Sequence, residues 1–195
     1  MTDRLEQVEI RIAFLEQANG ELTGLDDTDD EDTYTWDESD PMATYLIQVL
    51  TGDYVIVNGQ GPHGLPLTSV VFADDREAAQ PALDLIDDQI AFFEDYFGPY
   101  PLDRYGIAIT DSFPGLAMET QGRSFFSRED VLSYVPEDLF AHELAHMWFG
   151  DAVTPERWID IWLNESFASY AAWMWTAGGA DVDQFAQAAL GQRFP

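Results

Sequence analysis

The most informative part of the sequence is His142-Glu143-Leu144-Ala145-His146, and an amphipathic stretch follows it at 158–175. Residues four positions apart lie on the same face of an α-helix, so the two imidazoles can reach one metal ion. Glu143 falls between them and can hold a water molecule carried by that metal. Pro136 before the stretch and Gly150 after it are typical of helix ends. The pattern therefore predicts a metal-binding helix between these two residues.

Two histidines leave a catalytic zinc ion one protein ligand short. A third histidine six residues further on is excluded because Ala152 stands there. His63, the remaining histidine, falls in a loop far upstream. We therefore expect a carboxylate from the next helix, 158–175, in which Glu165 is the single acid well inside the segment. Asp160 is the rival ligand, although it lies nearer the helix start, where a negative charge suits the helix dipole.

Two acidic features have alternative interpretations. Asp151 can accept an N–H from a metal-binding histidine, or it can simply belong to the turn between the helices. The run from Asp26 to Asp32 contains no apolar residue and indicates a solvated loop. It does not fit a calcium loop of the EF-hand type, because with Asp27 as the first position the sixth is Asp32 rather than glycine.

The stretches His142–Asp151 and Trp158–Tyr170 together resemble the M1 family of zinc aminopeptidases, a group of gluzincins. In that family 18 residues separate the second histidine from the glutamate ligand, and residues 147–164 supply that number here. The resemblance implies Zn²⁺ as the cofactor. It further implies that Glu143 is the catalytic general base and that the metal ligands are His142, His146 and Glu165.

A second motif extends the resemblance upstream. Leu116-Ala117-Met118-Glu119-Thr120 is similar to the Gly-Ala-Met-Glu-Asn motif with which the family binds the free amino group and the backbone of its substrate. By that match Glu119 is the amine anchor, and Ala117 and Met118 contact the substrate backbone. The motif departs from the family at Leu116 and at Thr120. An aminopeptidase has to pair the N-terminal ammonium group with a fixed carboxylate, so the expected partner is a peptide with a free N terminus.

The N-terminal third reads as β-structure. Alternating or β-branched and aromatic residues predict strands at Val8–Phe14, Tyr34–Trp36, Ala43–Leu50, Tyr54–Val57 and Val70–Phe72. Asn19-Gly20 is typical of a hairpin turn. From Pro81 to Phe97 the pattern changes to helix, with Leu83, Ile86, Ile90 and Phe93 on one face. A short strand is expected at Tyr105–Thr110, and the rest is mostly helical.

These patterns predict an α+β chain with a boundary near residue 73. Ala18–Leu22 and Tyr34–Leu46 resemble the last strands of the N-terminal β-sandwich of the M1 family. The resemblance implies that residues 1–72 are the C-terminal end of an all-β sandwich domain. Residues 73–195 are then the first half of a thermolysin-like, mainly helical catalytic domain.

The composition excludes several classes of function. The 195 residues carry 37 acidic and 8 basic side chains, for a net charge of −29, whereas a phosphate backbone or an anionic membrane requires a basic surface. No apolar run is long enough to span a membrane. The charged start, Met1 to Glu9, does not fit a signal peptide, so we expect a cytoplasmic protein. All basic residues are arginines, and the excess of acid predicts a halophilic protein, because salt screens self-repulsion.

The resemblance also predicts a fragment. Family members are several times longer, and their catalytic tyrosine falls some tens of residues past the glutamate ligand, whereas here only Tyr170 follows Glu165. The expected partner is therefore the remainder of the full-length enzyme. Three alternatives to aminopeptidase activity stay open: a non-catalytic zinc-binding fragment without the oxyanion-stabilising tyrosine, an epoxide-hydrolase-like activity on the same site, and an acidic interaction module.

Overall fold

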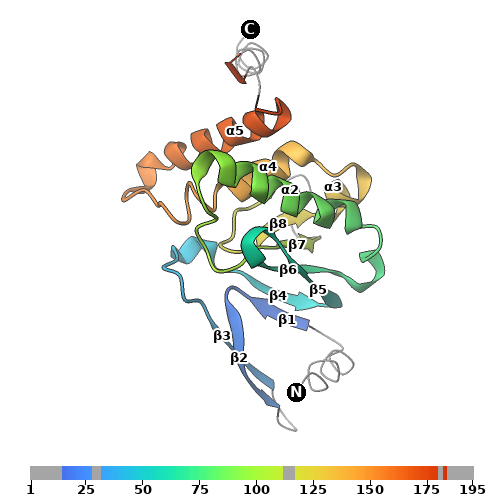
Figure 1. Ribbon diagram of the computed structural model, residues 1–195. Coiled ribbons are helices and arrows are strands. Elements are labelled where there is room, and N and C mark those ends of the chain that lie inside the picture. Colours follow the sequence, from blue (N-terminus) through green and yellow to red (C-terminus); the bar gives the residue numbers. More distant parts are fainter. Residues whose placement is uncertain (1–14, 28–31, 112–116, 180–181, 184–195) are drawn as a thin grey trace.

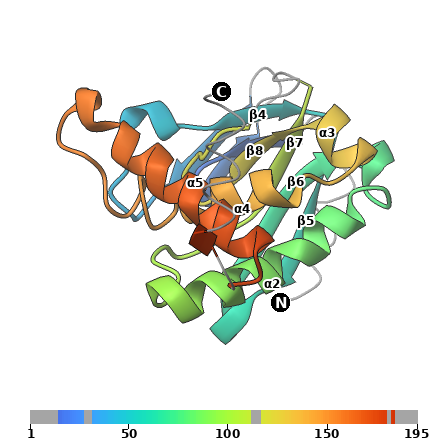
Figure 2. The same ribbon diagram turned by 90° about the horizontal axis from the view of Figure 1, so that it is seen from above.

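The computed structural model describes residues 15–27, 32–111, 117–179 and 182–183 (Figure 1). A four-stranded sheet lies at the centre, with the helices together on one of its faces and the N-terminal strands on the other side (Figures 1 and 2). The strands are β1 (Leu15–Ala18), β2 (Glu21–Asp27), β3 (Asp32–Asp37), β4 (Val49–Gly52), β5 (Tyr54–Gln60), β6 (Pro66–Phe72), β7 (Ile107–Thr110) and β8 (Ser124–Ser127). The α-helices are α2 (Gln80–Phe97), α3 (Arg128–Ser133), α4 (Glu137–Ala145) and α5 (Trp162–Thr176). Short 3₁₀ turns are η1 (Thr44–Leu46), η2 (Pro62–Gly64), η3 (Ala73–Asp75) and η4 (Trp158–Asp160).

The central sheet has the strand order β5-β6-β7-β8. β5 and β6 form an antiparallel pair, whereas β6 with β7 and β7 with β8 are parallel. α2 makes the crossover from β6 to β7, as a parallel connection requires. The segment before β7 runs so close to β6 that a Cβ atom on Gly106 would collide with the Thr68 carbonyl. Glycine is therefore required there.

The sheet crosses the boundary expected near residue 73. β5 and β6 come from the segment interpreted as the end of a sandwich domain, and β7 and β8 come from the segment interpreted as the catalytic domain. The division into 1–72 and 73–195 stays a prediction. The pairing of β6 with β7 does not favour it, because one sheet then belongs to both parts. The mixture of sheets and helices agrees with the expected α+β class.

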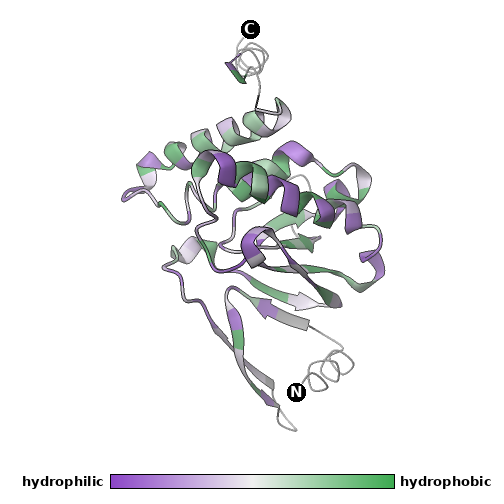
Figure 3. Ribbon diagram, viewed as in Figure 1, coloured by the Kyte–Doolittle hydropathy of each residue, from purple (hydrophilic) through white to green (hydrophobic). Residues whose placement is uncertain are grey.

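The helix predicted at Pro81–Phe97 is confirmed as α2. Pro81 lies in its first turn, where the missing N–H costs nothing, and Gly98 ends it with a φ of 89°. Ile86, Ile90 and Phe93 are buried in the main core, which also takes in β7, α4 and α5. Both hydrophilic and hydrophobic residues occur along α2 (Figure 3), as expected for an amphipathic helix with one buried face.

The N-terminal strands form two separate pairs. β2 and β3 make an antiparallel hairpin, and β1 pairs with β4. The hairpin predicted at Asn19-Gly20 is therefore wrong, because the strands on its two sides belong to different sheets. The Asn19 side chain is instead buried and donates hydrogen bonds to the carbonyls of Leu46 and Gln121.

Other strand predictions had mixed outcomes. Tyr34–Trp36, Tyr54–Val57 and Val70–Phe72 are confirmed within β3, β5 and β6. The strand expected at Ala43–Leu50 is wrong over most of its length. The chain there makes the turn η1, in which the Leu46 amide bonds to the Ala43 carbonyl, before β4 begins. Val8–Phe14 lies outside the described residues. The run Asp26–Asp32 spans the end of β2 and the start of β3, and its middle is likewise outside them.

A buried polar network joins the N-terminal strands to the segment after residue 117. The Arg123 guanidinium is buried and donates to the carbonyls of Ala18 and Thr68 and to the Gln48 side chain. Burial lowers the pKa of Arg123 to about 10, with a smaller contribution from Arg104. The Gln48 side-chain amide in turn donates to the Thr120 hydroxyl and the Arg123 carbonyl, at 2.8 Å each. These bonds fix the chain immediately after Glu119.

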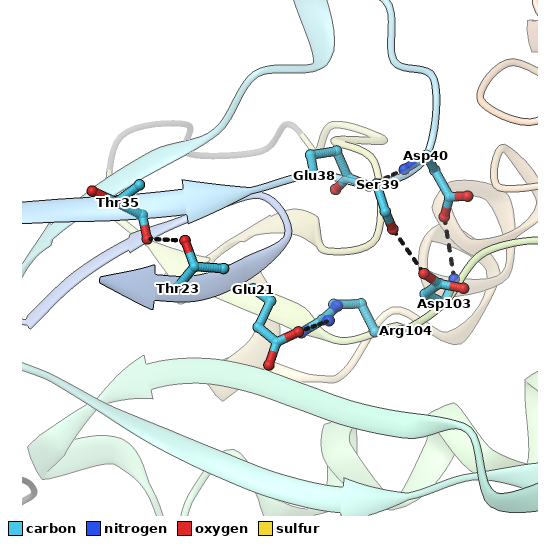
Figure 4. A network of polar contacts seen from close by, with 8 residues as sticks. All are labelled: Glu21, Thr23, Thr35, Glu38, Ser39, Asp40, Asp103 and Arg104. Carbon is cyan, nitrogen blue, oxygen red and sulfur yellow. Dashed lines mark hydrogen bonds and ion pairs between the residues drawn. The ribbon is translucent and has the colours of Figure 1, made fainter. Parts of the chain in front are cut away.

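A second, more exposed network lies beside the β2–β3 hairpin (Figure 4). The Ser39 hydroxyl donates to the Asp103 carboxylate at 2.8 Å, and the Asp103 amide donates to Asp40. Arg104 forms an ion pair with Glu21 at 3.8 Å. These contacts connect the hairpin and the segment that follows it to the loop before β7.

Among the described residues, no helix is both long and apolar enough to cross a membrane.

Candidate metal centre

The two histidines lie at the end of α4. His142 is in its last turn, and His146 is the C-cap residue, because α4 ends at Ala145 rather than near Gly150 as predicted. The helix stops early because the chain turns back, with the Asp151 amide bonding to the His146 carbonyl. His146 keeps helical φ and ψ, so the two rings still project together. Their Nε2 atoms lie 3.1 Å apart.

His146 is oriented by the turn that follows it. Its Nδ1 lies 3.1 Å from the Phe149 carbonyl oxygen, so this nitrogen carries the hydrogen and donates it. The Nε2 lone pair is then left free to bind a metal ion. Burial is the main cause of a lowered pKa for His146, which favours the neutral imidazole that a metal requires. Gly150, with a φ of 140°, allows the turn.

Glu165 approaches the histidines from α5. Its Oε2 lies 3.3 Å from Nε2 of His142 and 3.8 Å from Nε2 of His146. The helix begins later than predicted: the segment at 158–160 is the turn η4, so Glu165 lies in the first turn of α5 rather than well inside a helix. Helix α5 nevertheless packs against α4 and brings the Glu165 carboxylate to the two rings.

The three ligand atoms fit a zinc ion. Tetrahedral zinc binds nitrogen and oxygen at about 2.0–2.1 Å, which places neighbouring ligand atoms roughly 3.3–3.4 Å apart. The observed separations of 3.1, 3.3 and 3.8 Å bracket that value. Asp160, the rival ligand, is instead bonded twice to the Arg157 guanidinium, at 3.0 and 2.8 Å. His63 is exposed and faces Glu94 at 3.5 Å.

Glu143 lies on the buried side of α4 and is only 5% exposed. Burial, followed by the charges of Glu119 and Glu165, raises the pKa of the Glu143 carboxyl well above its usual range. The carboxylate oxygens of Glu119 and Glu143 and a ring nitrogen of His146 lie within 4.8 Å of one another. The structure therefore brings the expected general base and the expected amine anchor to the same place as the metal ligands.

The Ala117–Thr120 part of the second motif runs along the edge of the central sheet. Met118 makes two backbone hydrogen bonds with Phe125 of β8, at 3.1 and 2.8 Å. Ala117 and Glu119 on either side of it are partly buried. Leu116 lies outside the described residues. The motif thus makes a single antiparallel bridge at the edge of the sheet, and its last residue, Thr120, is held by the buried polar network.

Asp151 does not have the role considered for it as an acceptor from a histidine. The Phe149 carbonyl accepts from His146 instead. Asp151 is nevertheless more than a turn residue, because its side chain is buried and its two carboxylate oxygens meet no hydrogen-bond partner among the described residues. Burial, with the charges of Glu119 and Glu143, raises its pKa well above the usual range.

Two polar residues at the site were missed by the sequence analysis. The Tyr45 hydroxyl and the Asn164 side-chain nitrogen are buried and meet no hydrogen-bond partner in the described part of the chain. Both lie near Glu119 or the metal ligands: Asn164 precedes Glu165, and the charges of Glu119 and Asp151 act on Tyr45. Asn164 could have been found from the sequence, because it directly precedes the metal ligand Glu165. Tyr45 gave no local signal, because only the fold brings η1 to the site.

Comparison with known proteins identifies the family to which this chain belongs. Residues 81–192, more than half of the chain, match the model of the peptidase family M1 domain. The chain belongs to peptidase family M1. Endoplasmic reticulum aminopeptidase 1 of Mus musculus is a relative, 36% identical over 141 residues, and glutamyl aminopeptidase of Bos taurus is another, 37% identical over 156 residues. These alignments cover 66% and 73% of this chain but 15% and 16% of the relatives.

Solved structures of M1 enzymes share the fold. An M1 zinc metallopeptidase from Deinococcus radiodurans superposes with a TM-score of 0.78 at 28% identity, over 92% of this chain and 42% of that one. A variant of the same enzyme, at a TM-score of 0.77, is described as bound to a Tyr-Ser-Ala substrate. This M1 chain therefore spans less than half of the solved structure and about a sixth of the curated relatives.

Proposed function

We propose that this chain carries the zinc-binding and amine-recognising part of the active site of an M1 aminopeptidase, which removes the N-terminal residue of peptides. The main support is the convergence of His142, His146 and Glu165 from two helices, at separations that fit tetrahedral zinc. Under this proposal, the N-terminal strands are the end of a β-sandwich domain. The later part is then the first half of a thermolysin-like catalytic domain.

The chemistry divides between the metal and the carboxylates. Zinc held by the three ligands supplies Lewis acidity, which lowers the pKa of water and polarises a carbonyl group. Glu143 takes a proton from the attacking water onto its carboxylate and then delivers it to the nitrogen of the leaving amine. Its place between the two histidines puts it on the same side of α4 as the metal ligands, and its burial excludes bulk water.

Glu119 limits cleavage to the first residue. Its carboxylate lies close to both Glu143 and His146, so a substrate ammonium group paired with Glu119 has its first peptide bond near the general base. The bridge that Met118 makes at the edge of the sheet supports backbone pairing of this segment with an extended substrate. The Tyr-Ser-Ala peptide described for the Deinococcus radiodurans variant is a substrate of this class.

Hydrolysis of an aminoacyl anilide by the zinc-loaded chain tests the proposal. Glu143→Gln should lower the rate about 10²- to 10⁴-fold, because it removes general-base catalysis. It should leave the zinc content unchanged, because Glu143 is not among the three ligands. An N-acetylated anilide should not be cleaved, because it has no ammonium group for Glu119. Equal rates for the free and acetylated substrates would refute the aminopeptidase assignment, and faster turnover of an epoxide would favour the alternative reaction.

A second candidate is a zinc-binding fragment that completes its site only with the remainder of the enzyme. Large apolar side chains of η4 and α5 support it, because exposed surface of this kind marks a protein contact. These are Trp158, Ile159, Trp162, Phe167 and Tyr170, each at least 40% exposed. One zinc per chain without turnover of either substrate would favour this candidate.

A further inference from the structure

Tyr45 is a partly buried residue with a buried hydroxyl group that the proposed mechanism does not use. It lies in η1, about a hundred positions before the zinc-binding helix. Its hydroxyl is buried and meets no hydrogen-bond partner among the described residues, and the same holds for both carboxylate oxygens of Asp151 and the side-chain nitrogen of Asn164. Buried polar atoms without partners are rare in folded proteins and call for an explanation. Four such atoms, from three residues, gather beside the metal site.

The Tyr45 hydroxyl lies within reach of the Glu119 carboxylate and the Asn164 amide. Burial raises the pKa of Tyr45, and the charges of Glu119 and Asp151 raise it further. The hydroxyl therefore keeps its proton and is a hydrogen-bond donor. Since Glu119 is an acceptor when ionised, a hydrogen bond between the two side chains would satisfy the Tyr45 hydroxyl.

Tyr45 is held from two sides. Its ring packs edge-on against the Trp158 ring, with the centroids 5.2 Å apart. The neighbouring Leu46 is fully buried, and its carbonyl accepts a hydrogen bond from Asn19. Asn19 also bonds to the Gln121 carbonyl at 2.9 Å. The backbone around Tyr45 and the backbone just after Glu119 are therefore tied to the same side chain, so their relative position is fixed.

We infer that Tyr45 is a positioning residue for Glu119, whose hydroxyl holds the carboxylate in the orientation that pairs with the substrate ammonium group. This inference rests on the proposed function and deepens it. A glutamate side chain has several free torsions, and ordering them costs entropy that a fixed hydrogen bond removes before the substrate binds. Recognition of the amino group then depends on a residue of the N-terminal strand region as well as on the catalytic helices.

Two ligands that differ only in the amino group isolate this effect. Leucine hydroxamate and its des-amino counterpart, 4-methylpentanohydroxamate, carry the same side chain and the same zinc-chelating group. The ratio of their dissociation constants for the zinc-loaded chain, measured by calorimetry in molar salt, reports the amine contact alone. Zinc content is measured on the same samples.

For Tyr45→Phe we expect the preference for the amine ligand to fall about tenfold, the loss expected when a hydrogen bond to a charged group is removed. The affinity for the des-amino ligand and the zinc content should be unchanged. Tyr54→Phe is the matched control. Tyr54 is also a partly buried tyrosine that interacts with a neighbouring side chain, Thr110, but it lies in β5 away from the site. It should leave the preference as it is.

Several results would overturn the inference. If Tyr45→Phe weakens both ligands equally or releases zinc, the residue only supports the structure. If the preference does not change while Glu119→Gln abolishes it, Tyr45 does not act on Glu119, although the proposed function stands. If the unsubstituted chain shows no preference for the amine ligand, both the proposed function and the inference fail.

Discussion

Nε2 of His142 lies 3.3 Å from Oε2 of Glu165, although the two residues belong to different helices. Without a metal ion, the pKa of Glu165 is lowered chiefly by its hydrogen bond with His142. This contact holds the two ligand atoms together, so the site needs little rearrangement to bind zinc.

Glu165→Gln should therefore weaken zinc binding by more than about tenfold, because the amide keeps the shape but loses the charge of the ligand. Asp160→Asn is the matched control, since Asp160 lies five residues earlier and is occupied by Arg157. It should leave the affinity unchanged. Competition with a chromophoric chelator measures both variants. A larger loss for Asp160→Asn would instead identify the rival residue as the ligand.

Gly150 is expected to be required for the histidine geometry. Its φ is 140°, and an added Cβ atom would lie 3.1 Å from Asn164 Nδ2 and 3.3 Å from His146 Nδ1. Gly150→Ala should therefore lower the free energy of unfolding by about 1–3 kcal/mol and should also weaken zinc binding.

Gly98→Ala separates the two effects of that substitution. Gly98 also has a positive φ, 89°, but no atom lies within 4 Å of its added Cβ. The control should also lose stability, by about 1–3 kcal/mol, but should keep its zinc affinity. Urea unfolding and chelator competition on both variants test this. Equal zinc affinities for the two alanine variants would contradict the prediction.

Residues that act through local spacing were predictable from the sequence. The four-residue spacing of His142 and His146 depends only on helix geometry, and it survives although α4 ends at Ala145. The amphipathic pattern likewise located α2 to within one residue. Glu165 followed from the need for a third ligand and was supported by the M1 resemblance, whereas Glu119 came from the resemblance alone.

Features that depend on tertiary contacts were not predictable. Asn19-Gly20 has the composition of a hairpin turn, but burial of the Asn19 side chain against the Gln121 carbonyl overrides that preference. The strand propensity of the segment before β4 similarly gives way to η1. Tyr45 lies near Glu119 only because that turn and the buried network around Gln48 form together.

The stability of the chain should depend on pH through Glu38, which is not part of the metal centre. Its pKa is raised, mainly by burial and further by the charges of Asp40 and Asp103. A raised carboxyl pKa means that the folded chain binds the proton more tightly, so stability decreases as the pH rises through the range above 4.5. Glu38→Gln should therefore stabilise the chain at neutral pH. Since Glu38 is partly solvated, the gain should be at most about 0.5 kcal/mol.

The gain from Glu38→Gln should disappear below pH 4.5, where the carboxyl is protonated in both the folded and the unfolded chain. The substitution keeps an oxygen that can accept the Asp40 amide, so that hydrogen bond of 3.0 Å is retained. Thermal unfolding across the pH range measures the difference between the two proteins. A gain that persists unchanged in acid would mean that ionisation of Glu38 is not its cause.

The net charge of −29 predicts a stability that depends strongly on salt. Like charges repel in the compact state, and the screening length falls from about 10 Å at 0.1 M to about 3 Å at 1 M. The free energy of unfolding should therefore rise between these salt concentrations. Asp84 and Asp88 are exposed and one turn apart on α2, a like-charged spacing that costs about 0.2–0.5 kcal/mol. The double variant Asp84→Asn, Asp88→Asn should therefore be more stable than the parent in low salt and equally stable in high salt. If its advantage is the same in both, charge repulsion does not explain the salt dependence.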